Sequence, residues 1–116
     1  MDKKVVVLVR QEGLGQVPPQ DRRFGVEMMD RFLHTLESQP VKPQAICFYT
    51  DGVKLACQGS PVLAGLKLLE GLGVRLVICK SCIEYFGLKE RVAVGTVGGM
   101  NDIIKLLMEA DHTITV

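Results

Sequence analysis

The sequence has no tryptophan, few aromatic residues and almost no net charge. Aromatic residues make up 5% of its 116 residues, and 14 basic against 13 acidic side chains leave a formal net charge of +1. A surface that binds nucleic acid combines clustered basic side chains with aromatic side chains on which bases stack. The composition offers neither in quantity, so we expect no nucleic-acid partner.

Long hydrophobic runs are also missing. The first apolar run, Val5 to Val9, has five residues, whereas a membrane-spanning helix needs about 20. A secretory signal peptide needs a longer apolar segment and a small-residue cleavage site. We therefore expect no membrane partner and a cytoplasmic protein. Because thiols in the cytoplasm are usually reduced, the four cysteines favour chemistry over structural disulfides.

The bulk composition fits a folded protein. Hydrophobic residues make up 47% and charged residues 23% of the chain, and this balance and length predict one domain over residues 1–116. The mean hydropathy of +0.23 is high for a small monomer. Since large apolar patches are rarely left bare, we expect a homo-oligomer.

Apolar β-branched runs alternate with amphipathic segments along the whole chain. Strands are expected at residues 4–9, 45–49, 74–78, 92–94 and 113–116, and helices between them. For the last helix we expect an inner face of Ile103, Ile104, Leu107 and Met108. The alternation predicts an α/β fold with a mostly parallel sheet and helices on both of its faces.

Four loops are predicted at the carboxyl ends of strands, where ligands bind in open parallel sheets. They cover residues 11–19, 51–59, 79–82 and 95–99, and the expected ligand-binding residues in them are Gly13, Gly15, Gly52, Gly98 and Gly99. Glycines before the last helix suit an anion. The first loop lacks the third glycine of a dinucleotide fingerprint and contains Pro18 and Pro19, so we expect no cofactor.

Cys79 and Cys82 lie where the third predicted strand gives way to a helix. A helix N-terminus carries unpaired amides and partial positive charge, which stabilise a thiolate and lower its pKa. Spacing of three residues puts both sulfurs on one side of the first turn, so one thiol can attack what the other carries. We expect these two to be the catalytic residues, although a cysteine often only fills space in a core.

The other two cysteines are less suited to chemistry. Cys47 lies within an apolar strand and is expected in the core, whereas Cys57 either approaches the site or lies exposed. A zinc site with all four cysteines would need Cys47 to leave the core, and the sequence lacks the paired spacing of such sites. We therefore expect no metal.

Residues 74–87, VRLVICKSCIEYFG, resemble the strand–cysteine–helix segment of the DsrE-like sulfur-relay family, the DsrE/Tus/YchN group. The segment is most similar to the DsrE-like C-terminal domain of YedF-type selenium-metabolism proteins, which usually have Cys-Gly-Thr-Cys, then an aromatic residue and Gly-Leu. The matching residues are Cys79, Lys80, Ser81, Cys82, Tyr85, Phe86, Gly87 and Leu88. Further matches run in order from Leu14-Gly15 to Met100.

The resemblance implies a three-layer α/β/α sandwich around a five-stranded sheet, assembled into oligomers. It places Cys79 at the position of the sulfur-carrying cysteine of the Tus-type carriers, and Cys82 at the second cysteine of the YedF subgroup. One of them would hold a persulfide, and the other would release or receive it. Sulfur donor and acceptor proteins are the implied partners.

Three hypotheses about function stay open at this point. The first is a sulfurtransferase-like persulfide carrier that uses Cys79 with Cys82 as its partner thiol. The second is a thioredoxin-like dithiol oxidoreductase, because CxxC at a helix start is also a redox motif; the missing tryptophan and the lack of an obvious opposing proline argue against it. The third is a non-enzymatic oligomeric module that binds a small anion or a partner through the glycine loops.

Overall fold

The computed structural model describes residues 3–116, and its centre is one sheet of five parallel strands. The strands are β1 (Val5–Val9), β2 (Ala45–Phe48), β3 (Arg75–Cys79), β4 (Thr96–Gly98) and β5 (His112–Thr115), in the spatial order β4-β3-β2-β1-β5. Every neighbouring pair is parallel, with registers such as Val7 beside Ile46 and Ile46 beside Leu76. The carboxyl ends of all five strands therefore meet at one edge of the sheet.

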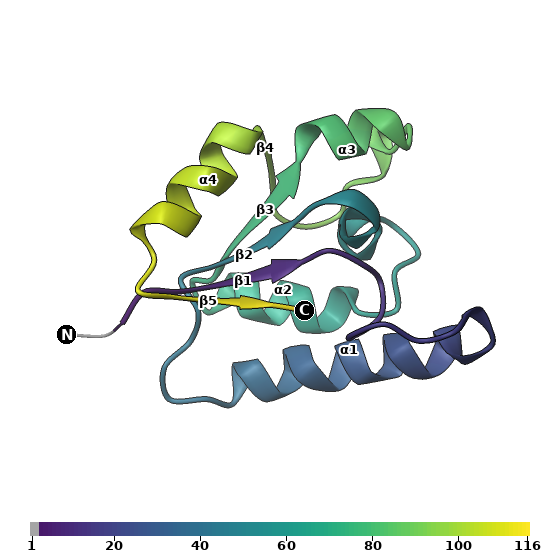
Figure 1. Ribbon diagram of the computed structural model, residues 1–116, viewed down its shortest axis with the longest axis horizontal. Helices are drawn as coiled ribbons and strands as arrows, with labels where there is room; N and C mark the ends of the chain where they lie inside the picture. Colours follow the sequence, from purple (N-terminus) through teal and green to yellow (C-terminus); the bar gives the residue numbers. More distant parts are fainter. Residues whose placement is uncertain (1–2) are drawn as a thin grey trace.

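Helices cover both faces of this sheet, which confirms the predicted α/β fold. The helices are α1 (Arg22–Glu37), α2 (Leu63–Gly71), α3 (Lys80–Tyr85) and α4 (Met100–Glu109), with short 3-10 helices η1 (Pro19–Asp21), η2 (Thr50–Ala56) and η3 (Lys89–Arg91). Helices α1 and α2 pack against each other on one side, and α4 lies on the other (Figure 1). Among residues 3–116, no helix is long and apolar enough to cross a membrane.

The central strands are buried because their side chains are apolar on both faces. Val6–Val9 of β1 and all of β2 are buried, as are the last four residues of β3. Met29 and Leu33 of α1 and Leu66 and Leu69 of α2 complete the core on their side. A strand covered on both faces reads as a continuous apolar run, which is why β1, β2 and β3 were predicted close to their observed positions.

The fourth strand was predicted wrongly at residues 92–94. Those residues instead lie beside the end of η2, where Val92 forms an antiparallel bridge with Cys57 and the Ala93 amide donates to the Ala56 carbonyl at 2.8 Å. The chain then turns at Gly95, which has φ of +78° and lies against Ile78 and Leu76, where a Cβ would overlap. The strand begins only after this turn, at Thr96.

The predicted inner face of the last helix was also partly wrong. Ile103 and Leu106 are the buried residues of α4 and Leu107 is half-buried, whereas Ile104 and Met108 are exposed. Residues three apart share a helix face, so Ile103 and Leu106 contact the sheet and leave Ile104 and Met108 on the outer side.

Helix η2 follows β2 where only a turn was expected. The Gly52 amide donates to the Tyr49 carbonyl at 3.1 Å, and Gly52 itself is buried against the end of β1. A Cβ on Gly52 would overlap the Val9 carbonyl oxygen. Gly52 is buried and serves close packing, and its role in ligand binding stays a prediction.

We expect Gly52→Ala to lower the free energy of unfolding by about 1–3 kcal/mol, because the added methyl group forces η2 away from β1. Gly71→Ala is the matched control, since a Cβ there meets nothing within 4 Å and alanine is the better helix former. Urea denaturation of both variants measures the difference. Equal midpoints for the two variants would contradict this account of Gly52.

Candidate active site

Cys79 and Cys82 meet at the carboxyl edge of the sheet. Cys79 is the last residue of β3 and the N-cap of α3, and Cys82 lies in the first turn of that helix. Their sulfurs are 3.0 Å apart, and the Cys82 thiol donates a hydrogen bond to the Cys79 sulfur. The predicted pair is thus within reach of thiol–disulfide chemistry without any rearrangement of the sheet.

The two thiols differ in their access to solvent. Cys79 is 2% exposed, whereas Cys82 is half-buried. Cys82 lines a small hollow of about 240 Å³ together with Thr50, Ser81, Tyr85 and Phe86, and most of this lining is apolar. A reagent that enters the hollow therefore meets Cys82 first.

Thr50, the first residue of η2, contacts the Cys82 sulfur. Its amide donates to the Cys82 sulfur at 3.0 Å, and its hydroxyl donates to the carbonyl oxygens of Arg10 and Tyr49, each at 2.8 Å. Thr50 has φ of +48°, the only positive φ of a non-glycine residue within 3–116. This conformation is unfavourable for a β-branched residue, and the two hydroxyl contacts help to hold it.

The pKa of Cys82 is raised above its ordinary value of 9.0, and the expectation of a lowered pKa was wrong for this residue. Burial is the main cause, and the hydrogen bond that the protonated thiol gives to Cys79 adds to it. The Thr50 amide acts in the opposite direction but is outweighed. A neutral thiol is favoured by desolvation and by a bond that only its protonated form can donate.

The other two cysteines lie away from the hollow. Cys47 is fully buried in β2, and burial raises its pKa to about 11 although the charge of Arg75 acts to lower it. Cys57 is buried too, with its thiol 3.4 Å from the Val53 carbonyl oxygen, and burial raises its pKa. Cys57 is therefore neither exposed nor part of the pair. Within residues 3–116, no group of three or more His, Cys, Asp and Glu could hold a metal ion.

Of the glycines predicted to bind a ligand, those before α4 lie beside the cysteine pair. Gly98 of β4 is the register partner of Cys79. Gly99 caps α4, and its amide donates to the Asp102 carboxylate at 2.9 Å. Of the two glycines before α4 that were expected to suit an anion, Gly99 thus already donates its amide to the protein's own carboxylate.

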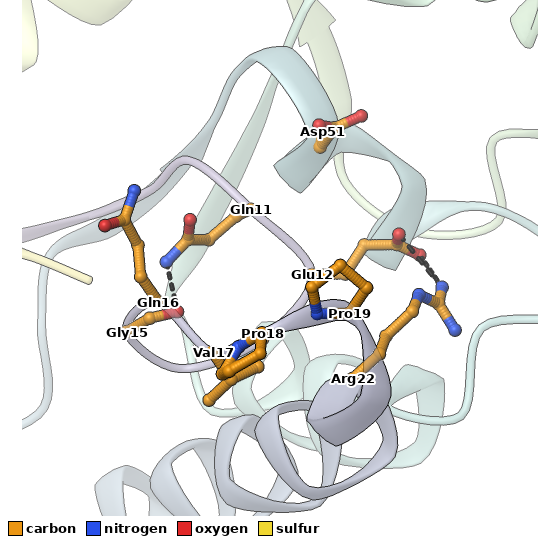
Figure 2. Close-up of a pocket in the computed structure, with 10 residues that line it drawn as sticks. Gln11, Glu12, Gly15, Gln16, Val17, Pro18, Pro19, Arg22 and Asp51 are labelled. Atoms are coloured by element: carbon orange, nitrogen blue, oxygen red, sulfur yellow. Dashed lines mark hydrogen bonds and ion pairs between the residues drawn. The ribbon is translucent and has the colours of Figure 1, made fainter.

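Gly13 and Gly15 line a different, larger hollow of about 650 Å³ on the first loop. Figure 2 shows this hollow, with Glu12 and Arg22 joined as an ion pair at 3.0 Å and Asp51 on the side of η2. Its lining contains no cysteine. The larger hollow therefore offers volume without a thiol, and the smaller one is the better candidate for thiol chemistry.

Two contacts at the small hollow had no signal in the sequence. Lys54 pairs with Asp51 at 2.8 Å, and its ammonium lies 4.3 Å from the centre of the Phe86 ring. Tyr85 is 85% exposed and contacts Phe86 edge to face, with ring centres 5.2 Å apart. Two aromatic rings thus line the hollow at Cys82, and a cation lies over one of them.

Comparison with known proteins adds a family and a fold. The model of the DsrE/DsrF-like family matches residues 3–116. The YchN protein from E. coli and MTH1491 from Methanobacterium thermoautotrophicum, a protein of unknown function, each superpose with a TM-score of 0.74 at 18% identity, over 99% of this chain and 100% of theirs. BT1422 from Bacteroides thetaiotaomicron, also of unknown function, superposes with a TM-score of 0.68 at 17% identity, over 98% of this chain and 95% of its own. No curated protein matches.

Iodoacetamide is expected to modify native protein at Cys82 alone, because the other three cysteines are buried, and at all four after unfolding. Because the Cys82 pKa lies above 9.0, its alkylation rate should still be rising at that pH. Intact-mass and peptide mapping measure site and rate. Native modification of Cys79 before Cys82 would contradict the assignment of access.

The Cys79→Ala variant tests the cause of that pKa. In the wild type, the hydrogen bond from the Cys82 thiol to Cys79 favours the protonated form of Cys82. The substitution removes the acceptor of this bond. The midpoint of Cys82 alkylation should therefore move to lower pH than in the wild type. An unchanged midpoint would mean that burial alone sets the pKa.

Proposed function

The chain belongs to the DsrE/DsrF-like family, and we propose that it is a persulfide carrier in a sulfur relay, with Cys79 and Cys82 as the reacting groups. The observation that carries this proposal is the 3.0 Å contact between two thiols, one of which opens into a hollow. The motif residues that resemble the YedF subgroup extend the proposal to a relay that handles selenium as well.

Loading needs no cofactor and no net oxidation. A thiolate of the pair attacks the outer sulfur of a donor persulfide, a new S–S bond forms, and the S–S bond of the donor breaks. The donor leaves as a thiolate and takes up the proton that the attacking cysteine gave up. The apolar lining of the hollow keeps water from the persulfide that results, which favours its survival until an acceptor arrives.

We propose that donor and acceptor are proteins. The hollow is lined by the exposed Tyr85 and the ring of Phe86, and the ammonium of Lys54 lies over that ring. Aromatic residues are enriched where proteins associate, and they would let a partner cover the opening while its own thiol reaches Cys82. A small-molecule donor would need none of this exposed aromatic surface.

Incubation with glutathione persulfide should add a sulfur atom, removable by dithiothreitol, to the wild type but not to the Cys79→Ser/Cys82→Ser double variant. Both proteins keep Cys47 and Cys57, so the double variant controls for reaction elsewhere. Intact mass measures the gain, and a selenium donor in a parallel sample tests the wider relay. Equal gain in both proteins would contradict the proposal, and a wild type that gains no sulfur at any time after mixing would favour a binding module.

We also propose that copies of the chain associate through α4. Met100, Ile104 and Met108 are exposed, Met108 to 81%, and their spacing of four residues forms one apolar stripe along the helix. A stripe of this kind is rarely left in water, and it agrees with the mean hydropathy of +0.23.

The Ile104→Lys/Met108→Lys variant is expected to have a lower mass in solution than the wild type, because charges on the stripe oppose its burial. Light scattering coupled to size exclusion measures the mass. Glu109→Lys is the control, since it adds a lysine to the same helix away from the stripe. A wild type that is monomeric at high concentration would overturn the proposed association.

A further inference from the structure

We propose that Cys82 receives the sulfur and that Cys79 is an internal thiol that displaces it as hydrogen sulfide, leaving a Cys79–Cys82 disulfide. The inference rests on the persulfide chemistry proposed above. It reverses the roles of the first hypothesis above, in which Cys79 carries the sulfur and Cys82 is its partner thiol. It also adds a product, sulfide, that forms without any acceptor protein.

Access decides which thiol is loaded. A nucleophile must come within about 3–3.5 Å of the sulfur that it attacks and in line with the bond that breaks. Cys79 is 2% exposed and lies at the end of β3, beside Gly98 of β4. Cys82 lines the hollow, so a donor that enters reaches the Cys82 sulfur, and the transferred sulfur stays in the hollow.

The surroundings of the Cys82 sulfur suit both steps. The Thr50 amide donates to it at 3.0 Å, which stabilises the thiolate during loading and acts against the burial that raises its pKa. Thr50 is in turn fixed by its hydroxyl, 2.8 Å from the Arg10 carbonyl oxygen. The Cys82 sulfur thus has a fixed amide, the Cys79 thiol and the hollow around it.

Release follows from the position of Cys79. After loading, the Cys79 thiolate attacks the inner sulfur, which is Cys82 Sγ and lies 3.0 Å away in the unloaded protein. A Cys79–Cys82 bond of about 2.05 Å forms, and the bond to the outer sulfur breaks. The outer sulfur leaves as hydrosulfide with both bonding electrons and takes up a proton. It is reduced to sulfide while the two cysteines are oxidised to the disulfide.

Two molecules of a low-molecular-weight thiol then reduce the disulfide by exchange, and they leave as their own disulfide. An acceptor thiol that reaches the outer sulfur first would take it by transfer instead. Cys79 and the acceptor therefore compete for the same persulfide, and Cys79 sets how long the sulfur is held.

The experiment follows intact mass over time after a short pulse of glutathione persulfide on wild type, Cys79→Ser and Cys82→Ser, with free sulfide trapped by monobromobimane. Cys79→Ser should gain one sulfur and keep it at least roughly ten times longer than wild type, because the intramolecular attack is gone. Wild type should gain the sulfur, release sulfide and finish two hydrogen masses below the reduced protein. Cys82→Ser should gain none.

A second measurement, made on the wild type, does not depend on whether the variants fold. Peptide mapping of wild type quenched early in the reaction should find the added sulfur on Cys82. Added sulfur on Cys79, or loading of Cys82→Ser but not of Cys79→Ser, would overturn the assigned roles and leave the carrier function standing. Sulfur lost from Cys79→Ser as fast as from wild type would overturn the internal displacement. No loading of any form would overturn both proposals together.

Discussion

The close approach of η2 to the end of β1 is the constraint on which the cysteine site depends. Gly52 permits it, because any side chain there would overlap the Val9 carbonyl oxygen. With η2 seated in this place, the Thr50 hydroxyl reaches the Arg10 carbonyl and the Thr50 amide reaches the Cys82 sulfur. The left-handed backbone of Thr50, with φ of +48°, is maintained by these contacts. The packing of η2 against the end of β1 thus fixes the direction of the Thr50 amide, which donates to the Cys82 sulfur.

The chemistry proposed for the cysteine pair depends on geometry more than on a low thiol pKa. Burial and the hydrogen bond to Cys79 raise the pKa of Cys82, so near neutral pH Cys82 holds its proton. The same contact at 3.0 Å makes attack by one sulfur on the other nearly free of entropic cost, because both are already in place. In the proposed mechanism, Cys82 stays protonated until a donor persulfide enters the hollow, and Cys79 then attacks the loaded Cys82 sulfur.

The sequence allowed the buried strands and the cysteine pair to be predicted, but not the contacts between loops. Val5–Val9 and Ala45–Phe48 are continuous apolar runs, and Cys79 could be located because β3 is equally apolar. Strand β4 has three residues at the edge of the sheet and gives little apolar signal, whereas the nearby run Val92–Val94 serves to pack η2. The conformation of Thr50 comes from tertiary contacts and opposes the preference of threonine, so no local pattern could reveal it.

The two outermost strands have a consequence for how the molecule behaves at high concentration. Strand β4 has three residues and β5 has four, and β5 is exposed and largely polar, with a histidine and two threonines among its residues. Edge strands present unpaired amides and carbonyls to which another chain can add, and short polar edges resist such addition. The short edge strands therefore oppose growth of the sheet by strand pairing, the route by which crowded β proteins form fibres.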